Sequence, residues 1–370
     1  MRYSLTIALL LFCTTLAAKP VQTELGSIDY QIVTTGLEHP WSLAFLPDGR
    51  YLVSERPGRL RVIEADGRLN PQAVGGLPAI KASGQGGLLD VVLHPDFQNN
   101  RWVYFSYNEA GPGGMGTAVA RGRLRGMRLH ETEVLFRLTP KSSSGRHFGS
   151  RLVFDRQGYL FITLGDRGDR PRAQDLADHA GSVIRLHDDG RIPTDNPFVG
   201  REGALAEIFS YGHRNIQGAT LHPQTGRLWT HEHGPQGGDE INLPQAGVNY
   251  GWPVITYGAN YVIGTRIGQG TQKWGMAQPL YYWVPSIAPS GMAFYRGDAL
   301  PFWQDDLFIG SLKFGLLVRL RIRDGEVVHE ERLLEGELGR IRDVRLGPDG
   351  LLYLLTDADN GRLVRLRPAQ

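Results

Sequence analysis

Short alternating runs of apolar and polar residues recur along this chain, each interrupted by a polar turn that contains glycine or proline. Because successive side chains of a strand point to opposite faces, each such run predicts a β-hairpin with one buried face. The pattern occurs six times, as LAFLPDGRYLVSE from Leu43, VVLHPDFQNNRWVYFSY from Val91, LVFDRQGYLFITLGD from Leu152, ATLHPQTGRLWTHEH from Ala219, MAFYRGDALPFWQDDLFIGSL from Met292 and VRLGPDGLLYLLTD from Val344.

The spacing of these hairpins predicts the architecture. Their starts lie 48 to 73 residues apart, several are followed by a third alternating strand, and helical periodicity is nearly absent. Antiparallel repeats of this length are typical of propeller blades. We therefore predict an all-β fold, a six-bladed β-propeller of four-stranded antiparallel blades. The early segment IDYQIVTTGL has no hairpin of its own and is expected to complete the last blade. A β-sandwich with a second domain would not account for six matching hairpins.

The N-terminus differs from the rest of the chain. Residues 1–18 combine one positive charge, an apolar stretch from Leu5 to Phe12 and small residues before Lys19, which is the pattern of a secretory signal peptide. We expect cleavage after Ala17 or Ala18 and a propeller domain over residues 24–370. Cys13, the only cysteine, lies in the leader, and no other apolar segment is long enough to span a bilayer. A periplasmic protein without disulfides or a membrane span is expected.

Composition and net charge limit the kinds of molecule that the protein is expected to bind. The 370 residues include 48 Gly and 22 Pro, with 41% hydrophobic residues, as in a loop-rich globular protein. A net charge of +2 argues against a nucleic acid bound through bulk electrostatics. A small molecule is the expected ligand, and a monomer or weak dimer the expected state.

One Gly/Pro-rich loop, HEHGPQGGDEINLPQAGVNYGWP, is crowded with oxygen ligands. Its polar side chains are Glu232, Asp239, Glu240, Asn242 and Asn249. Hard oxygen donors on irregular backbone suit Ca²⁺, although the spacing is not that of an EF-hand. Zinc is not expected, because His231 and His233 are only two residues apart and no third ligand follows. His179 and His187 have no partner motif and are expected at the surface.

Titratable groups also stand on loops of separate blades. His147, in SGRHFGS, taken alone indicates a histidine in a solvated turn. Arg214 with Asn215, then Lys313, and then the pair Arg340 and Arg342 follow on loops of three different blades. Cations placed in this way suit one polyanionic ligand, because arginine offers a fork to a carboxylate and lysine a point charge.

At these residues the chain resembles a known family, the soluble pyrroloquinoline quinone (PQQ)-dependent glucose/sorbosone dehydrogenases, in particular the periplasmic aldose sugar dehydrogenases. The resemblance spans nearly the whole mature chain. The motifs that carry it, in order, are GQGGLLDVVLHPDF, RHFGSRLVFD with ITLGDRG, GHRNIQG, HGPQGGDEIN with NYGWP, PSIAPSG, SLKFG and GRIRDV. Each motif alone is weak, whereas the ordered set is very specific.

The resemblance implies a fold, an activity and a cofactor. Members are six-bladed propellers in which PQQ lies over the central channel, bridged to the protein by Ca²⁺, and they oxidise aldoses at the C1 hydroxyl to the lactone. His147 matches the general base, Asp166 an acid near it, and Gln85, Arg214, Asn215, Lys313, Arg340 and Arg342 match residues that hold the cofactor. Arg214 would also stabilise negative charge on the quinone oxygen.

The same resemblance implies two calcium sites. Gly234 and Pro235 match the loop whose carbonyls bind the cofactor's Ca²⁺, and Glu240 and Tyr250 match a second, structural site. The electron acceptor is not identified by any motif.

Three positions depart from the glucose-specific members. Arg146 precedes the histidine where they carry an acid, the loop after Gly165-Asp166 differs, and Trp283 is followed by Val284 at their tryptophan position. All three are expected on the sugar side of the pocket, so we expect a broad range of aldoses.

Two other functional classes stay open from the residues alone. A Ca²⁺-dependent lactonase or esterase of similar fold would not need several loop cations, and a binding propeller would not need a histidine over the channel.

Overall fold

The computed structural model describes residues 20–369 of the chain. The expected signal peptide, residues 1–18, lies outside the described residues. The first described strand, β1, begins at Val21.

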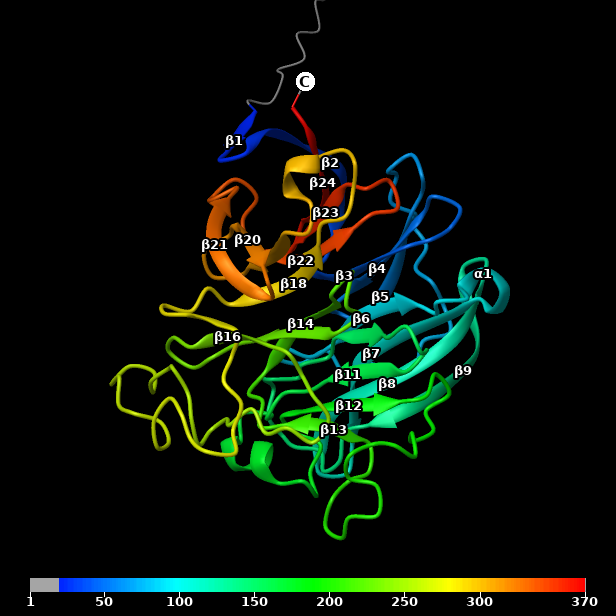
Figure 1. Ribbon diagram of the computed structural model, residues 1–370. Helices are drawn as coiled ribbons and strands as arrows, with labels where there is room; N and C mark the ends of the chain where they lie inside the picture. The colour runs from blue at the N-terminus through cyan, green and yellow to red at the C-terminus, as the bar shows by residue number, and fades with distance from the viewer. Residues whose placement is uncertain (1–19, 370) are drawn as a thin grey trace, which may run out of the picture.

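Six antiparallel sheets are arranged as blades around a common centre (Figure 1). Blade 1 comprises β3 (Pro40–Phe45), β4 (Tyr51–Glu55) and β5 (Arg59–Ile63), and blade 2 comprises β6 (Leu88–Leu93), β7 (Trp102–Gly111), β8 (Gly114–Arg125) and β9 (Arg128–Arg137). Blade 3 comprises β10 (Leu152–Phe154), β11 (Leu160–Thr163), β12 (Ser182–Leu186) and β13 (Ile208–Tyr211), and blade 4 comprises β14 (Ile216–Leu221), β15 (Leu228–Glu232), β16 (Asp239–Asn242) and β17 (Tyr281–Trp283). Blade 5 comprises β18 (Pro289–Phe294), β19 (Leu307–Ser311), β20 (Leu317–Arg323) and β21 (Glu326–Leu333). Each predicted hairpin is the inner pair of one blade.

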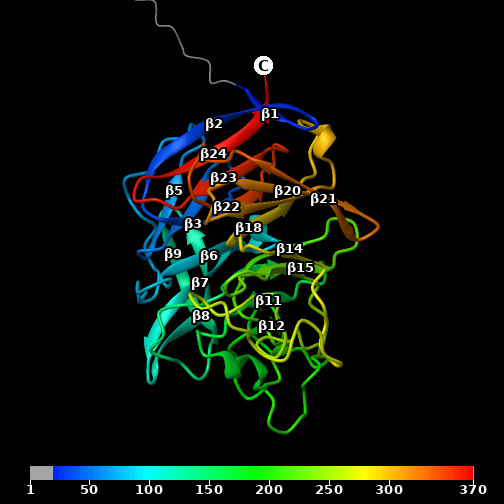
Figure 2. The ribbon, with the colours of Figure 1, turned by 90° about the vertical axis from the view of Figure 1, so that its left-hand side faces the viewer.

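The sixth blade is built from both ends of the chain. Its strands β22 (Ile341–Leu346), β23 (Leu352–Thr356) and β24 (Gly361–Pro368) are completed by β2 (Gly26–Leu37), with β1 (Val21–Thr23) at the edge. Strand β2 pairs antiparallel with β24, from Ile28 opposite Pro368 to Leu37 opposite Gly361, and the two lie side by side in Figure 2. The early strand therefore closes the ring, as its sequence predicted.

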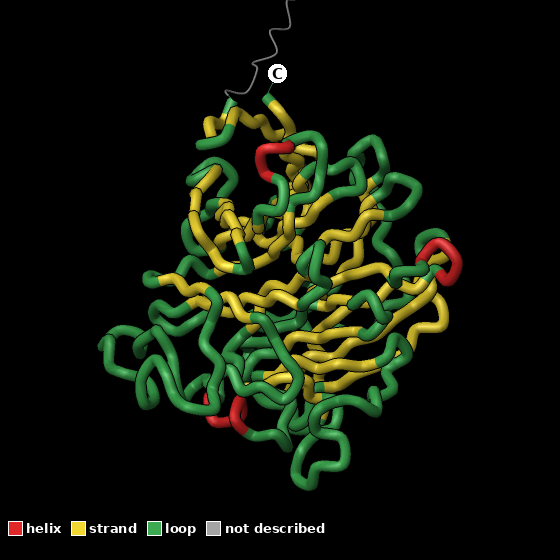
Figure 3. The backbone as a smooth tube through the Cα atoms, viewed as in Figure 1, coloured by secondary structure: helices red, strands yellow, loops and turns green. Residues whose placement is uncertain are grey.

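Helix is scarce, as Figure 3 shows. Within residues 20–369 it is confined to α1 (Phe97–Asn100) and the two 3₁₀ turns η1 (Arg170–Gln174) and η2 (Pro301–Trp303). No helix in this range has the length and hydropathy needed to cross a bilayer. Blade 1 is shorter than the others: beyond β5 it is extended only by isolated bridges, Leu60 to Val74 and Ile63 to Leu69. The prediction of a six-bladed, all-β propeller is confirmed.

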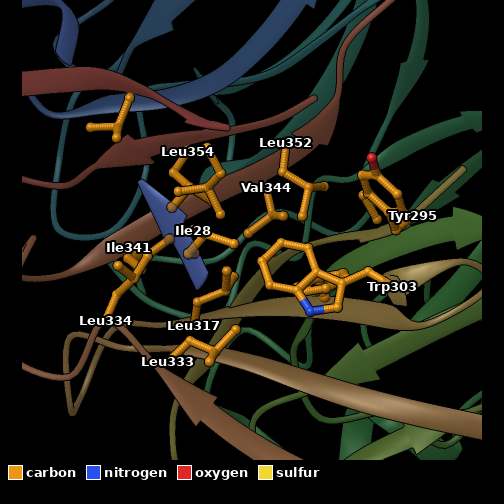
Figure 4. Close-up of a cluster of buried hydrophobic side chains, with 14 of the residues drawn as sticks. Ile28, Tyr295, Trp303, Leu317, Leu333, Leu334, Ile341, Val344, Leu352 and Leu354 are labelled. Atoms are coloured by element: carbon orange, nitrogen blue, oxygen red, sulfur yellow. The ribbon is translucent and has the colours of Figure 1, made fainter. Parts of the chain in front are cut away.

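Separate clusters of buried side chains pack neighbouring blades together. Blades 5 and 6 share the cluster in Figure 4, in which Trp303 and Leu317 from blade 5 lie near Val344 and Leu354 from blade 6. Comparable clusters join blades 1 and 2, 2 and 3, 3 and 4, 4 and 5, and 6 and 1. Because the strands alternate, one face of each blade is apolar toward one neighbour and the other face toward the next.

Charged residues, not apolar ones, join the inner strands across the centre. Arg151, just before β10, has its Nη1 2.9 Å from Oδ1 of Asp343 on β22 and 3.4 Å from Oδ1 of Asp90 on β6. Arg345 on β22 reaches the same two carboxylates at 2.8 and 2.7 Å. Asp90 and Asp343 are almost completely buried, and each also accepts a backbone N–H of a neighbouring blade, from Leu152 and from Leu43 respectively. This central ion cluster therefore ties four of the six inner strands together.

Removing one acid of the central ion cluster is expected to destabilise the ring. Asp90→Ala leaves Arg151 buried without full compensation, so we expect the free energy of unfolding to fall by about 3–5 kcal/mol. Urea titration followed by fluorescence measures this change. The matched surface variant Asp48→Ala, which removes an exposed partner of Arg50, should change stability by no more than about 0.5 kcal/mol. Equal effects of the two substitutions would contradict a structural role for the cluster.

Candidate active site

A cavity of about 980 Å³ lies at one end of the propeller, and all six blades contribute to it. Much of its lining comes from loops that precede an inner strand or follow the second strand of a blade, and from the adjoining ends of the inner strands. These two kinds of loop meet at the same end of an antiparallel hairpin. Of the residues predicted to hold a cofactor or its Ca²⁺, the lining includes Gln85, Asn215, Gly234, Pro235, Lys313, Arg340 and Arg342.

The cavity wall is strongly cationic on one side. Lys313 is exposed, while Arg340 and Arg342 project from the start of β22 and share one acceptor, Oδ2 of Asp357, at 3.0 and 3.1 Å. Arg56 also lines the cavity and donates to the Gly84 carbonyl at 2.7 Å. These charges lie far apart in the sequence but face one space, as expected for a polyanionic ligand.

His147 lies beside this cavity, in contact with Gln85 and Asp166, but is not itself one of the lining residues. Its neighbours Phe148 and Gly149 line the cavity, and its backbone N–H donates to Oε1 of Gln85 at 2.8 Å. Its Nδ1 lies 2.6 Å from Oδ1 of Asp166. If Nδ1 carries the proton that Asp166 accepts, the lone pair of Nε2 is left available to a substrate.

Asp166 is itself fixed by two further donors. Its Oδ2 accepts the indole N–H of Trp252 at 2.7 Å and its Oδ1 the backbone N–H of Gly168 at 2.6 Å, and the residue has no exposed surface. Burial alone raises the pKa of this carboxyl, but the hydrogen bond and charge of His147 and the Gly168 N–H hold its pKa below the usual value. Asp166 is therefore an ionised acceptor that orients the imidazole.

The pKa of His147 is lowered, chiefly because burial disfavours the imidazolium. The hydrogen bond to Asp166 opposes this shift and the charge of Arg214 reinforces it. At neutral pH the ring is therefore neutral and can accept a proton.

A buried arginine braces the loop that bears the histidine. Arg167 is 1% exposed, its Nη1 and Nη2 donate to the carbonyls of Arg146 and Ser144, and its guanidinium lies 3.5 Å from the ring centre of Phe148. Its Nε has no acceptor within the described residues. His147 has a φ of 56°, a left-handed conformation that a non-glycine residue keeps only when its surroundings enforce it. Arg167 supplies part of that constraint.

Arg214 lies behind the cavity rather than in its lining. Its Nη1 donates to the carbonyls of His233 and Gly234 at 2.9 and 2.6 Å, its guanidinium lies 5.3 Å from the ring centre of Trp252, and it is 7% exposed. The Gly234 carbonyl thus already has a donor in this structure. Asp239 fixes the same loop, accepting the N–H groups of Gly234 and Ala288 at 2.7 and 2.8 Å.

A second, very small cavity of about 10 Å³ lies beneath this loop, lined among others by Glu232, Glu240, Tyr250 and Arg214. Burial and repulsion from Glu232 raise the pKa of Glu240 well above its usual value. The Tyr250 hydroxyl donates its hydrogen to the Leu243 carbonyl at 2.5 Å. The structure therefore brings the predicted pair Glu240 and Tyr250 together around a space of ionic size.

No three His, Cys, Asp or Glu side chains converge as metal ligands anywhere in residues 20–369. A cation in the small cavity would therefore depend on backbone carbonyls in addition to Glu232 and Glu240. His233 donates its Nε2–H to the Pro289 carbonyl at 2.6 Å, and burial lowers its pKa to about 3.

A polar hollow of about 610 Å³ lies on the other side of the His147 loop. It is lined by residues 142–146 and 167–169, which include three serines, Arg146, Arg167 and Asp169. Arg146 is exposed and has no carboxylate within 4 Å among the described residues.

Val284, at the edge of the main cavity beside Gly237, is 63% exposed.

Two predictions about individual residues are wrong. Trp283 does not face the sugar side: it is 3% exposed, packs between blades 4 and 5, and donates its indole N–H to Glu330 at 2.7 Å. The residue lies in strand β17, where the pleat turns it inward. His179 is not at the surface either, because it is 4% exposed and its ring lies between the Thr139 N–H and Glu207 at 2.9 Å each.

Three contributors to the site were not singled out from the sequence. Arg167 and Trp252 lie within the quoted motifs ITLGDRG and NYGWP, so their place in those motifs was the available signal. Asp357 follows β23 in the plain sequence LLTDAD, where nothing local distinguishes it from a turn acid.

Comparison with known proteins agrees with this geometry. Residues 37–365 match the family model described as Glucose / Sorbosone dehydrogenase. The chain is 48% identical over 349 residues to the aldose sugar dehydrogenase YliI of Escherichia coli, covering 93% of this chain and 94% of that protein.

Two solved structures extend the comparison. The apo-form of the soluble aldose sugar dehydrogenase from Escherichia coli superposes with a TM-score of 0.90 and 47% identity, over 92% of this chain and 100% of that one. The PQQ-bound form of the aldose sugar dehydrogenase from Streptomyces coelicolor superposes with a TM-score of 0.74 and 29% identity, over 92% and 98%. The resemblance inferred from the motifs is confirmed, and this chain belongs to the glucose/sorbosone dehydrogenase family.

Proposed function

We propose that this protein is a PQQ-dependent dehydrogenase that oxidises aldoses at the anomeric C1 hydroxyl to the lactone. The observation that carries the proposal is the His147–Asp166 pair beside a cavity whose wall holds Lys313, Arg340 and Arg342. Relatives across the full length of the chain are named aldose sugar dehydrogenases, and one is solved with PQQ bound.

The cavity suits PQQ, a planar tricarboxylate. A volume of about 980 Å³ accommodates a ligand of this size, and the cationic wall matches its negative charge. Gln85, Asn215, Lys313, Arg340 and Arg342 would hold it. When bound, PQQ would supply the electrophile that accepts the C1 hydride of the sugar at its C5.

The protein's own contribution to the reaction is proton transfer and charge stabilisation. Nε2 of His147 would take the proton of the C1 hydroxyl, while Asp166 keeps Nδ1 protonated and the ring in place. Arg214, 7% exposed and stacked beside Trp252, would add positive charge behind the Gly234 loop, toward the quinone oxygen. Burial keeps the imidazole neutral, so it is ready to act at neutral pH.

Ca²⁺ suits both of the sites at which it was expected. Gly234 and Pro235 line the main cavity, and their carbonyl oxygens would bind the cation of the cofactor, with the Gly234 carbonyl shared with Arg214. Glu232, Glu240 and the Tyr250 carbonyl would bind a second cation, which would relieve the repulsion between the two carboxyls. This second ion would brace the loop from Glu232 to Tyr250.

A broad substrate range is part of the proposal. The residues that depart from the glucose-specific members, Arg146 and Val284, lie on open surfaces beside His147 and Gly237 and do not close a pocket around one sugar. The signal-peptide pattern of residues 1–18 supports export of this chain to the periplasm, and reoxidation requires an electron acceptor that is still to be identified.

Replacing the general base tests the proposal directly. His147→Gln should bind PQQ as the wild type does but reduce it roughly 10²–10⁴-fold more slowly, because the C1 hydroxyl loses its proton acceptor. The measurement is single-turnover PQQ reduction by glucose after reconstitution with PQQ and Ca²⁺. His222→Gln, in a turn remote from the cavity lining, serves as the control.

Absence of cofactor reduction in the reconstituted wild type with any aldose would refute the dehydrogenase and favour a hydrolase or a binding protein. Wild-type reduction by the His147→Gln variant would remove His147 as the base.

The pH profile tests the role of Asp166. The hydrogen bond to Asp166 raises the pKa of His147 against the larger lowering by burial, so removing the carboxylate lowers this pKa further. We expect the acidic limb of kcat/KM to lie below pH 6.5 in the wild type and to move to still lower pH in Asp166→Asn, while kcat falls roughly 10²-fold or more. A limb that moves upward would contradict the assignment.

Calcium dependence tests the second cavity. The melting temperature should rise with the logarithm of free Ca²⁺, since binding to the folded state alone stabilises it. In Glu240→Gln most of this rise should be lost, whereas with chelator the variant should melt no lower than the wild type, because repulsion from Glu232 is removed. Glu202→Gln, on an exposed loop, is the control. If chelator changes neither the melting temperature nor the activity of the wild type, both calcium sites are refuted.

A further inference from the structure

We propose that Asp357 is a positioning residue for the cofactor, which holds Arg340 and Arg342 in the orientation that receives a carboxylated ligand. The inference rests on the proposed function, because it concerns the affinity of the same cavity for PQQ. It assigns a role to a residue outside every motif that identified the family.

Asp357 is placed where the side chains of Arg340, Arg342 and His39 meet. It directly follows β23, its side chain is 11% exposed, and it lines the cavity. Its Oδ2 accepts from Nη2 of Arg340 at 3.0 Å and from Nη2 of Arg342 at 3.1 Å, while its Oδ1 lies 2.8 Å from Nδ1 of His39. Its backbone N–H donates to the Arg340 carbonyl at 2.8 Å, so the contact is fixed at both main chain and side chain.

The two arginines need such a common acceptor. They stand two residues apart at the start of β22, so their side chains leave the same face and their charges repel one another. Asp357 accepts a hydrogen bond from Nη2 of each arginine. Nη1 of Arg340 donates to the Leu312 carbonyl at 3.0 Å, and Nη1 of Arg342 donates to Oε1 of Gln217 at 3.3 Å. Neither Nε has an acceptor within the described residues, which leaves a donor on each guanidinium for a ligand.

Asp357 remains a carboxylate while it does this. Burial alone raises its pKa, but Arg342, His39 and Arg340 together lower that pKa well below the usual value. The ion pairs are therefore present at every pH at which the protein is folded and active, and the two guanidiniums are ordered before the ligand arrives.

Two effects of Asp357 on an anionic ligand oppose one another. Its negative charge repels a carboxylate, whereas its hydrogen bonds remove rotamer freedom that ligand binding would otherwise have to remove. Arg340 is 52% exposed, so solvent screens the repulsion at this side of the cavity. Loss of the common acceptor leaves each guanidinium with a single hydrogen bond, to the Leu312 carbonyl or to Gln217, and so loosens two long side chains at once. The ordering effect is therefore the larger, and removing the carboxylate should weaken binding despite making the cavity more positive.

Asp359 offers a matched control in the same loop. It carries the same charge two residues further on and lies 2.8 Å from Nε2 of His39, but its side chain is 95% exposed and it contacts neither arginine. Asp359→Asn changes the net charge by the same amount as Asp357→Asn without freeing Arg340 or Arg342. Comparison of the two variants separates positioning from charge.

The experiment is equilibrium dialysis of PQQ, with Ca²⁺ and without sugar, against the wild-type chain and each variant. We expect Asp357→Asn to raise the Kd for PQQ at least tenfold and Asp359→Asn to change it less than twofold. In a chain that already carries both Arg340→Gln and Arg342→Gln, Asp357→Asn should raise the Kd for PQQ by less than a further twofold, because its effect passes through those arginines. A merely structural role for Asp357 would persist in that background.

Asp357→Glu is the control for a folding defect, since it keeps the negative charge but moves the carboxylate by the length of one methylene group. It should raise the Kd several-fold with an unchanged circular dichroism spectrum. An equal or lower Kd in the folded Asp357 variants, or a full effect in the arginine-free background, would overturn the positioning role while leaving the proposed function intact. A wild-type chain that binds no PQQ would overturn the proposed function and this inference with it.

Discussion

The central ion cluster is the constraint on which the rest of the structure depends. Arg151 and Arg345 bridge Asp90 and Asp343 across the centre of the ring, where the inner strands come closest. Each acid also binds a backbone N–H of an adjacent blade, so the ionic contacts fix the relative height of neighbouring inner strands. Apolar packing between blades is tolerant of small shifts, whereas hydrogen-bonded charges removed from water are not. The loops that line the cavity are joined to these inner strands, so the shape of the cavity depends on how the strands are aligned.

The active-site residues are linked to the same centre through few contacts. Arg151 donates to the carbonyls of Gln217 and Arg342, and the side chain of Gln217 in turn accepts from Arg342, which lines the cavity. Gln217 also donates to the Gly149 carbonyl, two residues from His147. The cationic wall and His147, the proposed general base, thus rest on one buried polar network. This arrangement explains how loops from six blades hold a single geometry although residues 20–369 contain very little helix.

Opposite electrostatic environments lie on the two sides of the Gly234 loop. The main cavity has arginines and a lysine facing the ligand, with Asp357 as their internal counterion. The small cavity has Glu232 and Glu240 close together, and Glu232 is hydrogen-bonded to the His213 imidazole and to the Arg214 backbone N–H. The first environment suits a polyanion and the second a cation. Because Arg214 donates to the backbone of the loop between them, it links the two sites mechanically as well as electrostatically.

The sequence by itself determined the blades, their number and the early strand that closes the ring, because strand alternation and turn residues are local signals. Its ordered motifs also identified the family and most of the cavity lining, including Gln85, Lys313 and Arg342. Only the tertiary structure decided how these residues are used. It placed Arg214 behind the Gly234 loop, buried Trp283 between two blades, and joined Asp357 to two arginines that are 15 and 17 residues away. Such partnerships depend on the relative position of separate loops, which is fixed by packing and by buried charges across blades and leaves no periodic trace in the chain.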